Sequence, residues 1–255
     1  MNKNGKPVIR NGNRLLNQMF NQNYFTMLRE SKGNMYKFIT HTWNPIKGKC
    51  SHDCSYCYMK QIAPHSNPPR IDEKKFNTNL GRGNFIFIGS STDMFADDVP
   101  SQWIMRVLDY CKQQHDAGNK NAFLLQSKNP KRFLEFVDHP IAKRCVFGTT
   151  IESNRFYPEI MCNAPQIEER VEAMEKMANL GFTTMVTAEP LLSFDLEQML
   201  EYIKRCNPKK VNIGRNSCRN IVLPEPSKEE VKQLIEGLKD IPKIEIKKNA
   251  KLWMA

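Results

Sequence analysis

Three cysteines, Cys50, Cys54 and Cys57, stand within eight residues in the spacing C-x3-C-x2-C. Three thiolates at this spacing can ligate three corners of a cubane iron–sulfur cluster. A site with four cysteines is closed and mainly transfers electrons, whereas a site with three leaves one iron without a protein ligand. Open coordination positions are where bound metals do chemistry. The spacing therefore indicates a cluster with one position open for chemistry.

Two other uses of these thiols stay open at this point. A zinc knuckle would take His52, His41 or His65 as its fourth ligand, but structural zinc sites usually contain two spaced pairs of ligands, and no second pair of cysteines is present. Incidental thiols are the other alternative. Disulfides are disfavoured because we find no signal peptide and because the remaining cysteines are single. Those cysteines are at positions 111, 145, 162, 206 and 218.

The cysteine loop resembles the signature of the radical S-adenosylmethionine (radical SAM) superfamily, C-x3-C-x-aromatic-C, with Tyr56 in the aromatic position. The resemblance implies a [4Fe-4S] cluster on Cys50, Cys54 and Cys57 whose open iron binds S-adenosylmethionine. It also implies that one electron from the cluster cleaves S-adenosylmethionine to a 5′-deoxyadenosyl radical, which abstracts hydrogen from a substrate. We expect a single cluster, since no second group of cysteines is present.

Length and composition favour one large domain with a substantial core, because the chain has 255 residues, 40% of them hydrophobic, and no evident linker. No apolar run approaches the length of a membrane span, and the polar N-terminus predicts a cytoplasmic protein. The formal charge of +11 favours a nucleic acid or nucleotide substrate. It equally suits docking of an acidic reductant such as flavodoxin or ferredoxin. The oligomeric state is not indicated.

Short apolar strands alternate with amphipathic helices from about residue 36 onward. The helices include a stripe at 167–178 ended by Gly181, and a capping box of Ser227 and Glu230. The other apolar stripes cover 103–111, 196–203 and 231–238. The predicted strands cover 36–40, 85–89, 122–125, 145–149, 183–187, 211–214 and 244–246.

Repeated strand–helix units predict an α/β fold with a parallel sheet. The resemblance implies a partial (β/α)6 TIM-like barrel of the radical SAM type, which agrees with the number of units. We therefore predict a barrel domain over residues 36–255. Residues 1–35 are predicted to form a short N-terminal extension or cap, and the apolar side chains between positions 15 and 25 suggest that it packs against the domain.

Polar residues follow every predicted strand, and in parallel barrels these positions meet at one edge, where the chemistry takes place. Single Ser, Thr or Asp residues there often only cap helices or form turns. Six polar exits at one edge predict a lined cavity. The candidate cofactor-binding residues are Tyr56, Ser91, Thr92, Asp93, Thr150, Glu152, Ser153, Glu189, Gly214 and Arg215.

The resemblance gives these candidates roles by strand order. The loop after the second strand often carries Gly-Gly-Glu and binds the methionyl amine, but this chain has Gly89-Ser90-Ser91-Thr92-Asp93 instead. Residues after the fourth strand commonly contact the ribose or carboxylate, and those after the sixth contact adenine or the carboxylate. Cys218, after the sixth strand, is a candidate donor of hydrogen to a product radical, although a buried structural thiol is the plainer interpretation.

A narrower resemblance covers nearly the whole chain from residue 40. The segments 42–45, 89–95, 126–130 and 188–192 resemble a phage-associated branch of radical SAM proteins with Thr-Trp-Asn-Pro before the cysteines and Cys-Glu-Pro-Leu-Leu near the fifth strand. The cysteine loop is also locally similar to that of spore photoproduct lyase, a DNA-repair enzyme. Against a radical SAM enzyme stand two alternatives. One is a non-catalytic nucleic-acid-binding protein with a structural metal, and the other is a simple electron carrier, which the missing fourth cysteine disfavours.

Overall fold

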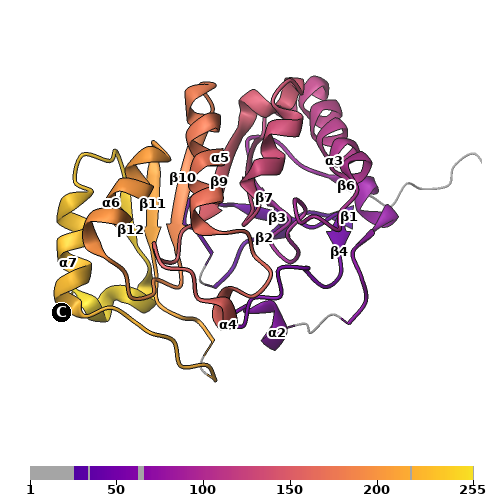
Figure 1. Cartoon of the computed structure of the whole chain (residues 1–255). Coiled ribbons are helices and arrows are strands. Elements are labelled where there is room, and N and C mark those ends of the chain that lie inside the picture. Colours follow the sequence, from indigo (N-terminus) through magenta and orange to yellow (C-terminus); the bar gives the residue numbers. More distant parts are fainter. Residues whose placement is uncertain (1–25, 34, 63–65, 219, 255) are drawn as a thin grey trace, which may run out of the picture.

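A sheet of eight strands forms the centre of the computed structural model, which describes residues 26–33, 35–62, 66–218 and 220–254 (Figure 1). Its strand order is β12-β11-β10-β9-β8-β7-β3-β2, and every neighbouring pair is parallel except β2 and β3. The strands of this sheet are β2 (Arg29–Glu30), β3 (His41–Trp43), β7 (Phe85–Ile88), β8 (Ala122–Gln126), β9 (Cys145–Thr150), β10 (Thr183–Ala188), β11 (Lys210–Ile213) and β12 (Ile244–Ile246).

Two small ribbons lie outside the main sheet. In one, β1 (Thr26–Met27) pairs with β6 (Thr78–Asn79) in parallel, and in the other β4 (Ile46–Lys47) pairs with β5 (Arg70–Ile71) antiparallel.

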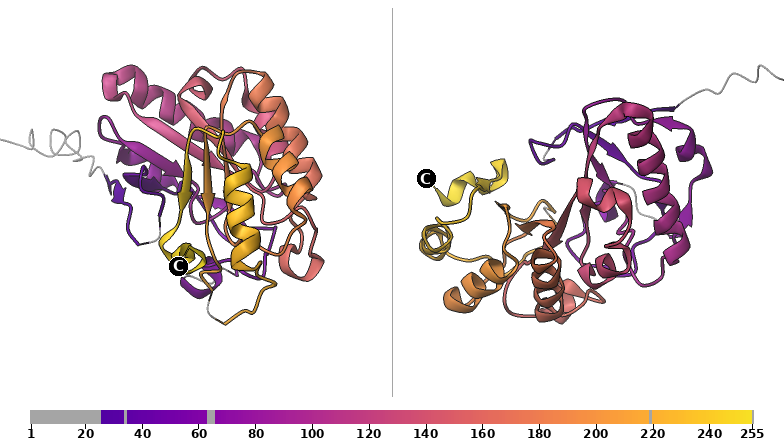
Figure 2. Two further views of the ribbon diagram at one scale, coloured as in Figure 1. Left: turned by 90° about the vertical axis from the view of Figure 1, so that its left-hand side faces the viewer. Right: turned by 90° about the horizontal axis from the view of Figure 1, so that it is seen from above.

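Helices cover one face of the sheet, as Figure 1 and the view from above in Figure 2 show. This placement follows from the strand order, because right-handed crossovers between sequential parallel strands put every connection on the same side. The α-helices are α2 (Met59–Ile62), α3 (Ser101–Gln114), α4 (Pro158–Met161), α5 (Ile167–Asn179), α6 (Leu196–Arg205) and α7 (Lys228–Gly237). The shorter 3-10 or π turns are η1 (Glu73–Asn77), η2 (His115–Asn119), η3 (Pro130–Phe136), η4 (Pro140–Arg144) and η5 (Lys248–Trp253).

The main core lies between the sheet and these helices. Alternate strand residues such as Ile86, Ile88 and Phe123 are fully buried there. Phe133 of η3 packs edge-on against Phe95 and tilted against Phe147 of β9. Complete burial of such side chains stabilises the fold by about 1.5–3 kcal/mol each. None of the helices in the described part of the chain is both long and apolar enough to cross a membrane.

The strand predictions from residue 85 onward are confirmed to within one or two residues, including the seventh at 244–246. The prediction of a first strand at 36–40 is wrong, because the strand is β3 at His41–Trp43. Tyr36 and Ile39 instead pack against the other face of the sheet, where they form a hydrophobic cluster together with Leu124 and Met185. Burial against a sheet face, rather than strand pairing, explains why this segment is apolar.

The predicted helices are confirmed, with one difference in the connections. Only the 3-10 turns η3 and η4 connect β8 to β9, so this unit lacks an α-helix. Gly181 follows α5 with a φ of 83°, which is the left-handed conformation expected after a helix end. The Ser227 hydroxyl accepts a hydrogen bond from the Glu230 amide, and the Glu230 carboxylate accepts one from the Ser227 amide.

Replacing Ser227 with Ala should lower the free energy of unfolding by about 0.5–2 kcal/mol, because it leaves an amide at the start of α7 without a partner. Urea denaturation followed by circular dichroism measures this change. Ser66→Ala is the matched control, since Ser66 is exposed and lies outside helices and strands. Equal stability of the two variants would contradict the assigned cap.

Candidate cofactor site at the cysteine loop

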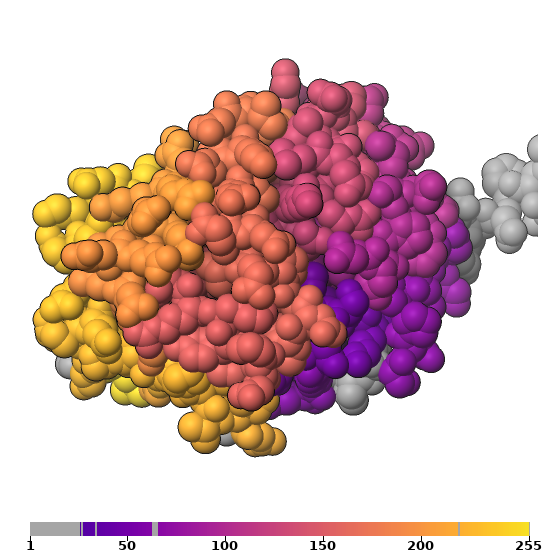
Figure 3. Space-filling model, viewed as in Figure 1, coloured from indigo at the N-terminus to yellow at the C-terminus, as the bar shows by residue number. Residues whose placement is uncertain are grey.

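The cysteine loop connects β4 to α2 and lies at the edge of the sheet where the parallel strands end. Its residues contact segments that follow β7, β9 and β11, as described below. In the space-filling view of Figure 3, the indigo and purple N-terminal third reaches the surface beside the pink middle third of the chain. Cys54 is buried, while Cys50 and Cys57 are half-buried. The loop therefore presents its three thiols from the edge that the sequence predicted.

The backbone of the loop is fixed at its start by Gly48. This residue has a φ of 128°, and a side-chain carbon there would collide with the Pro68 carbonyl, so only glycine fits. The Gly48 carbonyl accepts a hydrogen bond of 2.9 Å from the Thr92 hydroxyl, after β7. Asp53 also has a left-handed conformation, and its carboxylate pairs with Lys49 and Lys60. These contacts set the path of the chain before the first cysteine and between the first two.

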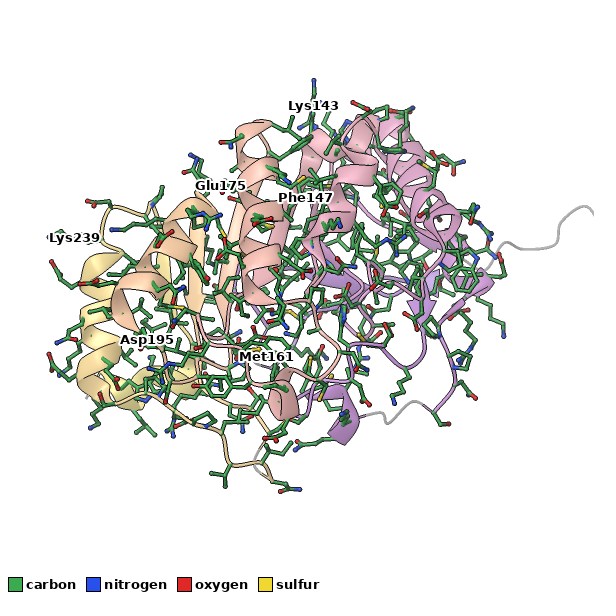
Figure 4. The ribbon with its side chains drawn as sticks, viewed as in Figure 1. Lys143, Phe147, Met161, Glu175, Asp195 and Lys239 are labelled. Atoms are coloured by element: carbon green, nitrogen blue, oxygen red, sulfur yellow. The ribbon has the colours of Figure 1, made fainter. Side chains whose placement is uncertain are left out.

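A second set of contacts ties the loop to α4 and the residues after it. The Ser55 amide donates to the Ile160 carbonyl at 2.9 Å, and the Asn163 amide donates to the His52 carbonyl at 3.0 Å. The Cys54 thiol lies 3.5 Å from the carbonyl of Met161. Figure 4 labels Met161 at the lower edge of the sheet, beneath β9. The loop is thus held by backbone groups on both sides of Cys54.

Three buried side chains and the partly exposed Lys128 form a charged network directly behind the loop. The Glu152 carboxylate, two residues past β9, accepts hydrogen bonds from the Tyr56 hydroxyl and from Arg170 Nη1 at 2.7 Å. It also pairs with Lys128 Nζ at 3.0 Å. Glu152 and Arg170 are completely buried, and Lys128 lies over the Tyr56 ring at 5.1 Å. This network carries two positive charges and one negative charge.

The protonation states in this network follow from the pairing. Burial alone would raise the pKa of Glu152, but the charges of Arg170 and Lys128 outweigh it and lower this pKa to about 2. Burial lowers the pKa of Lys128, but the charge of Glu152 raises it, and the resulting pKa lies above its usual value. Burial and the neighbouring carboxylate together raise the pKa of Tyr56 well above its usual range. Lys128 and Glu152 are therefore charged at neutral pH, while Tyr56 stays a neutral donor.

Asp93 holds the other side of the loop. Its Oδ2 accepts hydrogen bonds of 2.9 Å from His52, from the Ser127 hydroxyl and from the Lys128 amide, and its Oδ1 accepts one from the Phe95 amide. Burial opposes the charge, but His52 and the other donors lower the pKa of Asp93. The structure thus surrounds this carboxylate with donors of the protein itself, whereas sequence analysis predicted it to be a residue that binds S-adenosylmethionine.

The thiols fit the chemistry of a cluster ligand set. Burial raises the pKa of Cys50 to about 12, with a contribution from Asp93, and burial also raises that of Cys54. Lys128 and Arg170 act in the opposite direction on Cys54. Binding of a metal cluster would deprotonate all three thiols. The excess positive charge behind Cys54 complements the negative charge that three thiolates add.

The remaining candidates after β7 and β9 serve mainly to join loops. Ser91 donates its amide to the Asn44 side chain, and Thr92 bonds to the loop as described above. The Ser153 hydroxyl donates to the Ser193 carbonyl at 2.7 Å. Thr150 is the exception, because its hydroxyl accepts a hydrogen bond of 3.4 Å from Gln126, at the end of the neighbouring strand. Thr150 therefore faces the inner side of the sheet, away from the helices.

The candidates after β10 and β11 meet each other. A side chain at Gly214 would lie 2.7 Å from the Glu189 Cδ atom, so the absence of a side chain there makes room for this carboxylate. Glu189 also pairs with Lys247 at 3.6 Å. Arg215 instead turns to Glu225 and lies 5.5 Å from the Trp253 ring. The structure brings Glu189 and Gly214 together and directs Arg215 to a neighbouring carboxylate.

Cys218 lies against the cysteine loop rather than in a cavity. Its buried thiol donates to the Tyr56 carbonyl at 3.0 Å. Burial raises the pKa of Cys218, with a smaller contribution from Cys57. This contact gives Cys218 a role in holding the loop.

Sequence analysis did not identify Arg170 as a functional residue. It lies three residues after Ile167 and four before Met174, within the apolar stripe of α5. A charged residue inside such a stripe is buried, and buried charges require partners. That position was a signal from which a buried carboxylate partner could have been inferred.

Among the described residues, no group of three or more His, Cys, Asp or Glu side chains is placed to hold a single metal ion. A cubane binds each thiolate through a different iron, so it does not require three sulfurs to meet at one point. Of the histidines considered for zinc, His52 bonds to Asp93 and His41 to the Thr40 hydroxyl. His65 lies outside the described residues.

Comparison with protein families gives a match over residues 34–205 to a family described as protein of unknown function (DUF5131). The chain belongs to this family. The match includes the whole cysteine loop, Glu152 and Arg170, and ends at the last residue of α6. No curated protein matches the chain.

Several solved structures are similar to this DUF5131 member in fold. A point mutant of spore photoproduct lyase superimposes with a TM-score of 0.63 at 10% identity, covering 86% of this chain and 80% of the lyase. Streptococcus suis SuiB bound to S-adenosylmethionine gives 0.53 at 12% identity, covering 80% and 49%. The enzyme anSMEcpe with bound S-adenosylmethionine and a peptide gives 0.50 at 11% identity, covering 80% and 63%. At such identities the likeness shows the fold alone.

Replacing Glu152 with Gln should lower the free energy of unfolding by about 3–5 kcal/mol at pH 7, because Arg170 and Lys128 lose their buried counter-charge. The pKa of this carboxyl is lowered from 4.5 to about 2 by folding, so its contribution is fully present above about pH 4.5 and is lost as the pH falls toward 2. Denaturant titrations at several pH values should therefore show the two proteins converging in acid.

The control for this change is Glu73→Gln, which breaks an exposed pair with Arg106. It should change the free energy of unfolding little at any pH, since exposed ion pairs contribute little. A Glu152→Gln protein as stable as the control would contradict the buried charge network.

Proposed function

We propose that this protein is a radical SAM enzyme, which cleaves S-adenosylmethionine reductively and abstracts a hydrogen atom from its substrate. The observation that carries the proposal is the position of the C-x3-C-x2-C loop at the edge of the sheet where sequential parallel strands end. Active sites of parallel α/β folds gather at this edge. The similar fold of structures solved with bound S-adenosylmethionine supports the same reaction.

The fold in this proposal is a partial (β/α)6 TIM-like barrel. Support comes from the sequential strand order and from helices on one face, which together leave the other face to form the interior. In this proposal the barrel domain covers residues 36–255 and follows an N-terminal extension in 1–35.

Cys50, Cys54 and Cys57 would hold a [4Fe-4S] cluster, which would supply the electron for cleavage and an open iron for S-adenosylmethionine. Around it, the residues of the chain divide into two groups. Asp93 and Glu152 position the cysteine loop through His52 and Tyr56. Thr150 and Glu189 are the candidates for direct contact with S-adenosylmethionine, and Gly214 lies beside Glu189. Ser91, Thr92, Ser153 and Arg215 are further candidates.

We further propose that Cys218 donates hydrogen to a product radical, in addition to holding the loop. The Cys218 thiol bonds to the Tyr56 carbonyl and interacts electrostatically with Cys57, and both contacts support a position of this thiol beside the cluster. The substrate is a nucleotide or nucleic acid, in keeping with the net charge of +11. The reductant is a flavodoxin or ferredoxin in the cytoplasm, where thiols stay reduced. The phage-associated branch is the part of the superfamily to which we assign the chain.

Anaerobic reconstitution should load about four irons and four sulfides per chain. With dithionite and S-adenosylmethionine, the loaded protein should then release 5′-deoxyadenosine, which chromatography with mass detection measures. Cys54→Ala should lose both the cluster and the product. Cys111→Ala is the matched control, because Cys111 is a buried thiol of α3 in the helix-side core.

Two results would overturn the proposal. One is zinc in place of iron, which would favour a nucleic-acid-binding protein with a structural metal. The other is equal 5′-deoxyadenosine from the wild type and from Cys54→Ala, which would show that the loop is not its source. Close to eight irons per chain would contradict the prediction of a single cluster.

A further inference from the structure

A cavity of about 400 Å³ lies at the open side of the sheet, on the face that carries Tyr36 and Ile39. One wall is formed by residues 31–33, 35–37 and 39, which precede β3, and the other by the end of β12 and the two residues after it. These two segments are far apart in sequence but joined in space, since Lys37 pairs with Glu245 at 3.4 Å.

Positive charge dominates this cavity. Four of the described residues that line it are lysines, at positions 32, 37, 247 and 248, and Glu245 is their single carboxylate. Glu245 is shared, because it pairs with Lys210 at 2.6 Å as well as with Lys37. Lys32 and Lys248 are exposed, and no carboxylate of the described chain lies within ion-pair distance of either. The cavity therefore has lysines whose charge the described protein does not balance.

The lysines are also close enough to repel one another. Burial lowers the pKa of Lys247, with a contribution from Lys37, although Glu189 acts against it. Burial likewise lowers the pKa of Lys210, with contributions from Lys243 and Lys247. Lys210 and Lys243 do not line the cavity. The group of lysines therefore extends beyond the cavity, along the paired strands β11 and β12. A bound polyanion would relieve the repulsion between these lysines.

The cavity leads toward the residues assigned to S-adenosylmethionine. The Tyr36 side chain lines it and donates its hydroxyl to Gln126, at the end of β8, with a distance of 2.9 Å. Gln126 in turn bonds to Thr150 on the inner face of the sheet. Lys247, which lies over the Tyr36 ring at 4.6 Å, pairs with Glu189. A chain bound at the lysines would thus lie two side chains away from the inner strand ends.

We propose that this lysine-lined cavity binds the phosphate backbone of single-stranded nucleic acid and so defines the substrate class of the enzyme. The role as substrate rests on the proposed function, whereas the binding itself does not. A cavity of this volume is too small for a duplex, which would have to be opened or to extrude a nucleotide. Positive grooves that follow the backbone are the usual feature of single-strand binding.

The experiment measures binding of a fluorescein-labelled 15-nucleotide single strand to the full chain by fluorescence anisotropy, without cluster or S-adenosylmethionine. The wild type should bind, and its affinity should fall steeply between about 50 and 200 mM salt. The pair Lys32→Glu and Lys248→Glu should weaken binding at least about tenfold and reduce the salt slope by about 1.4, since two phosphate contacts are lost.

The matched control is the pair Lys143→Glu and Lys176→Glu, which makes the same change in net charge at exposed lysines of η4 and α5. Figure 4 labels Lys143 at the opposite end of the sheet from Met161. This pair should keep the wild-type salt slope. Glu245→Gln, which removes the single lining carboxylate, should tighten binding several-fold and gives a second test in the opposite direction.

Five results would overturn the proposal. Four are no binding by the wild type, equal losses in both lysine pairs, weaker binding by Glu245→Gln, and equal competition by a mononucleotide. The last would identify a nucleotide pocket. A duplex that binds better than the single strand would also contradict it. Because 5′-deoxyadenosine release is measured without nucleic acid, failure here and failure of the proposed radical reaction remain distinguishable.

Discussion

The buried carboxylate of Glu152 is the interaction on which the site depends. It is the charged partner that allows Arg170 of α5 to lie fully inside the protein and Lys128 to lie nearly so, and it accepts the Tyr56 hydroxyl from the middle of the cysteine loop. The Glu152 side chain thus connects four parts of the chain. These are the segment after β9, Lys128 in the segment after β8, the helix α5 and the cysteine loop. Since a buried charge without a partner is strongly destabilising, these four parts must assemble together.

A comparable constraint acts on the opposite side of the loop. Asp93 accepts four hydrogen bonds, and the one from His52 reaches the loop between the first and second cysteines. Tyr56 lies between the second and third. Each interval between cysteines therefore carries one residue bonded to a carboxylate from a different strand end. Contacts from the protein itself therefore hold the loop on both sides, and a well-supported loop of this kind is what a site with fixed ligands requires.

Much of the fold followed from the sequence, because strands covered on both faces are continuous apolar runs, and the segment 85–88 is such a run. The segment 36–40 has the same composition for a different reason. Its side chains cover the inner face of the sheet, and an apolar pattern does not distinguish a strand from a segment packed on strands. The cluster site could be predicted from the sequence because its three cysteine ligands lie within eight residues of one another. The partnership of Glu152 with Arg170 could not, since only folding brings these two residues together.

The charges of the molecule differ in how they are balanced. Behind the cysteine loop, each buried charge has a partner in the protein, and the network is left with one positive charge beside the thiols. At the open side of the sheet, lysines outnumber carboxylates, and Lys32 and Lys248 are exposed. A buried excess charge can be balanced only by a group bound beside it, whereas an exposed excess acts on ligands from solution. The first arrangement therefore suits a resident anionic cluster, and the second suits an anionic chain that binds and leaves.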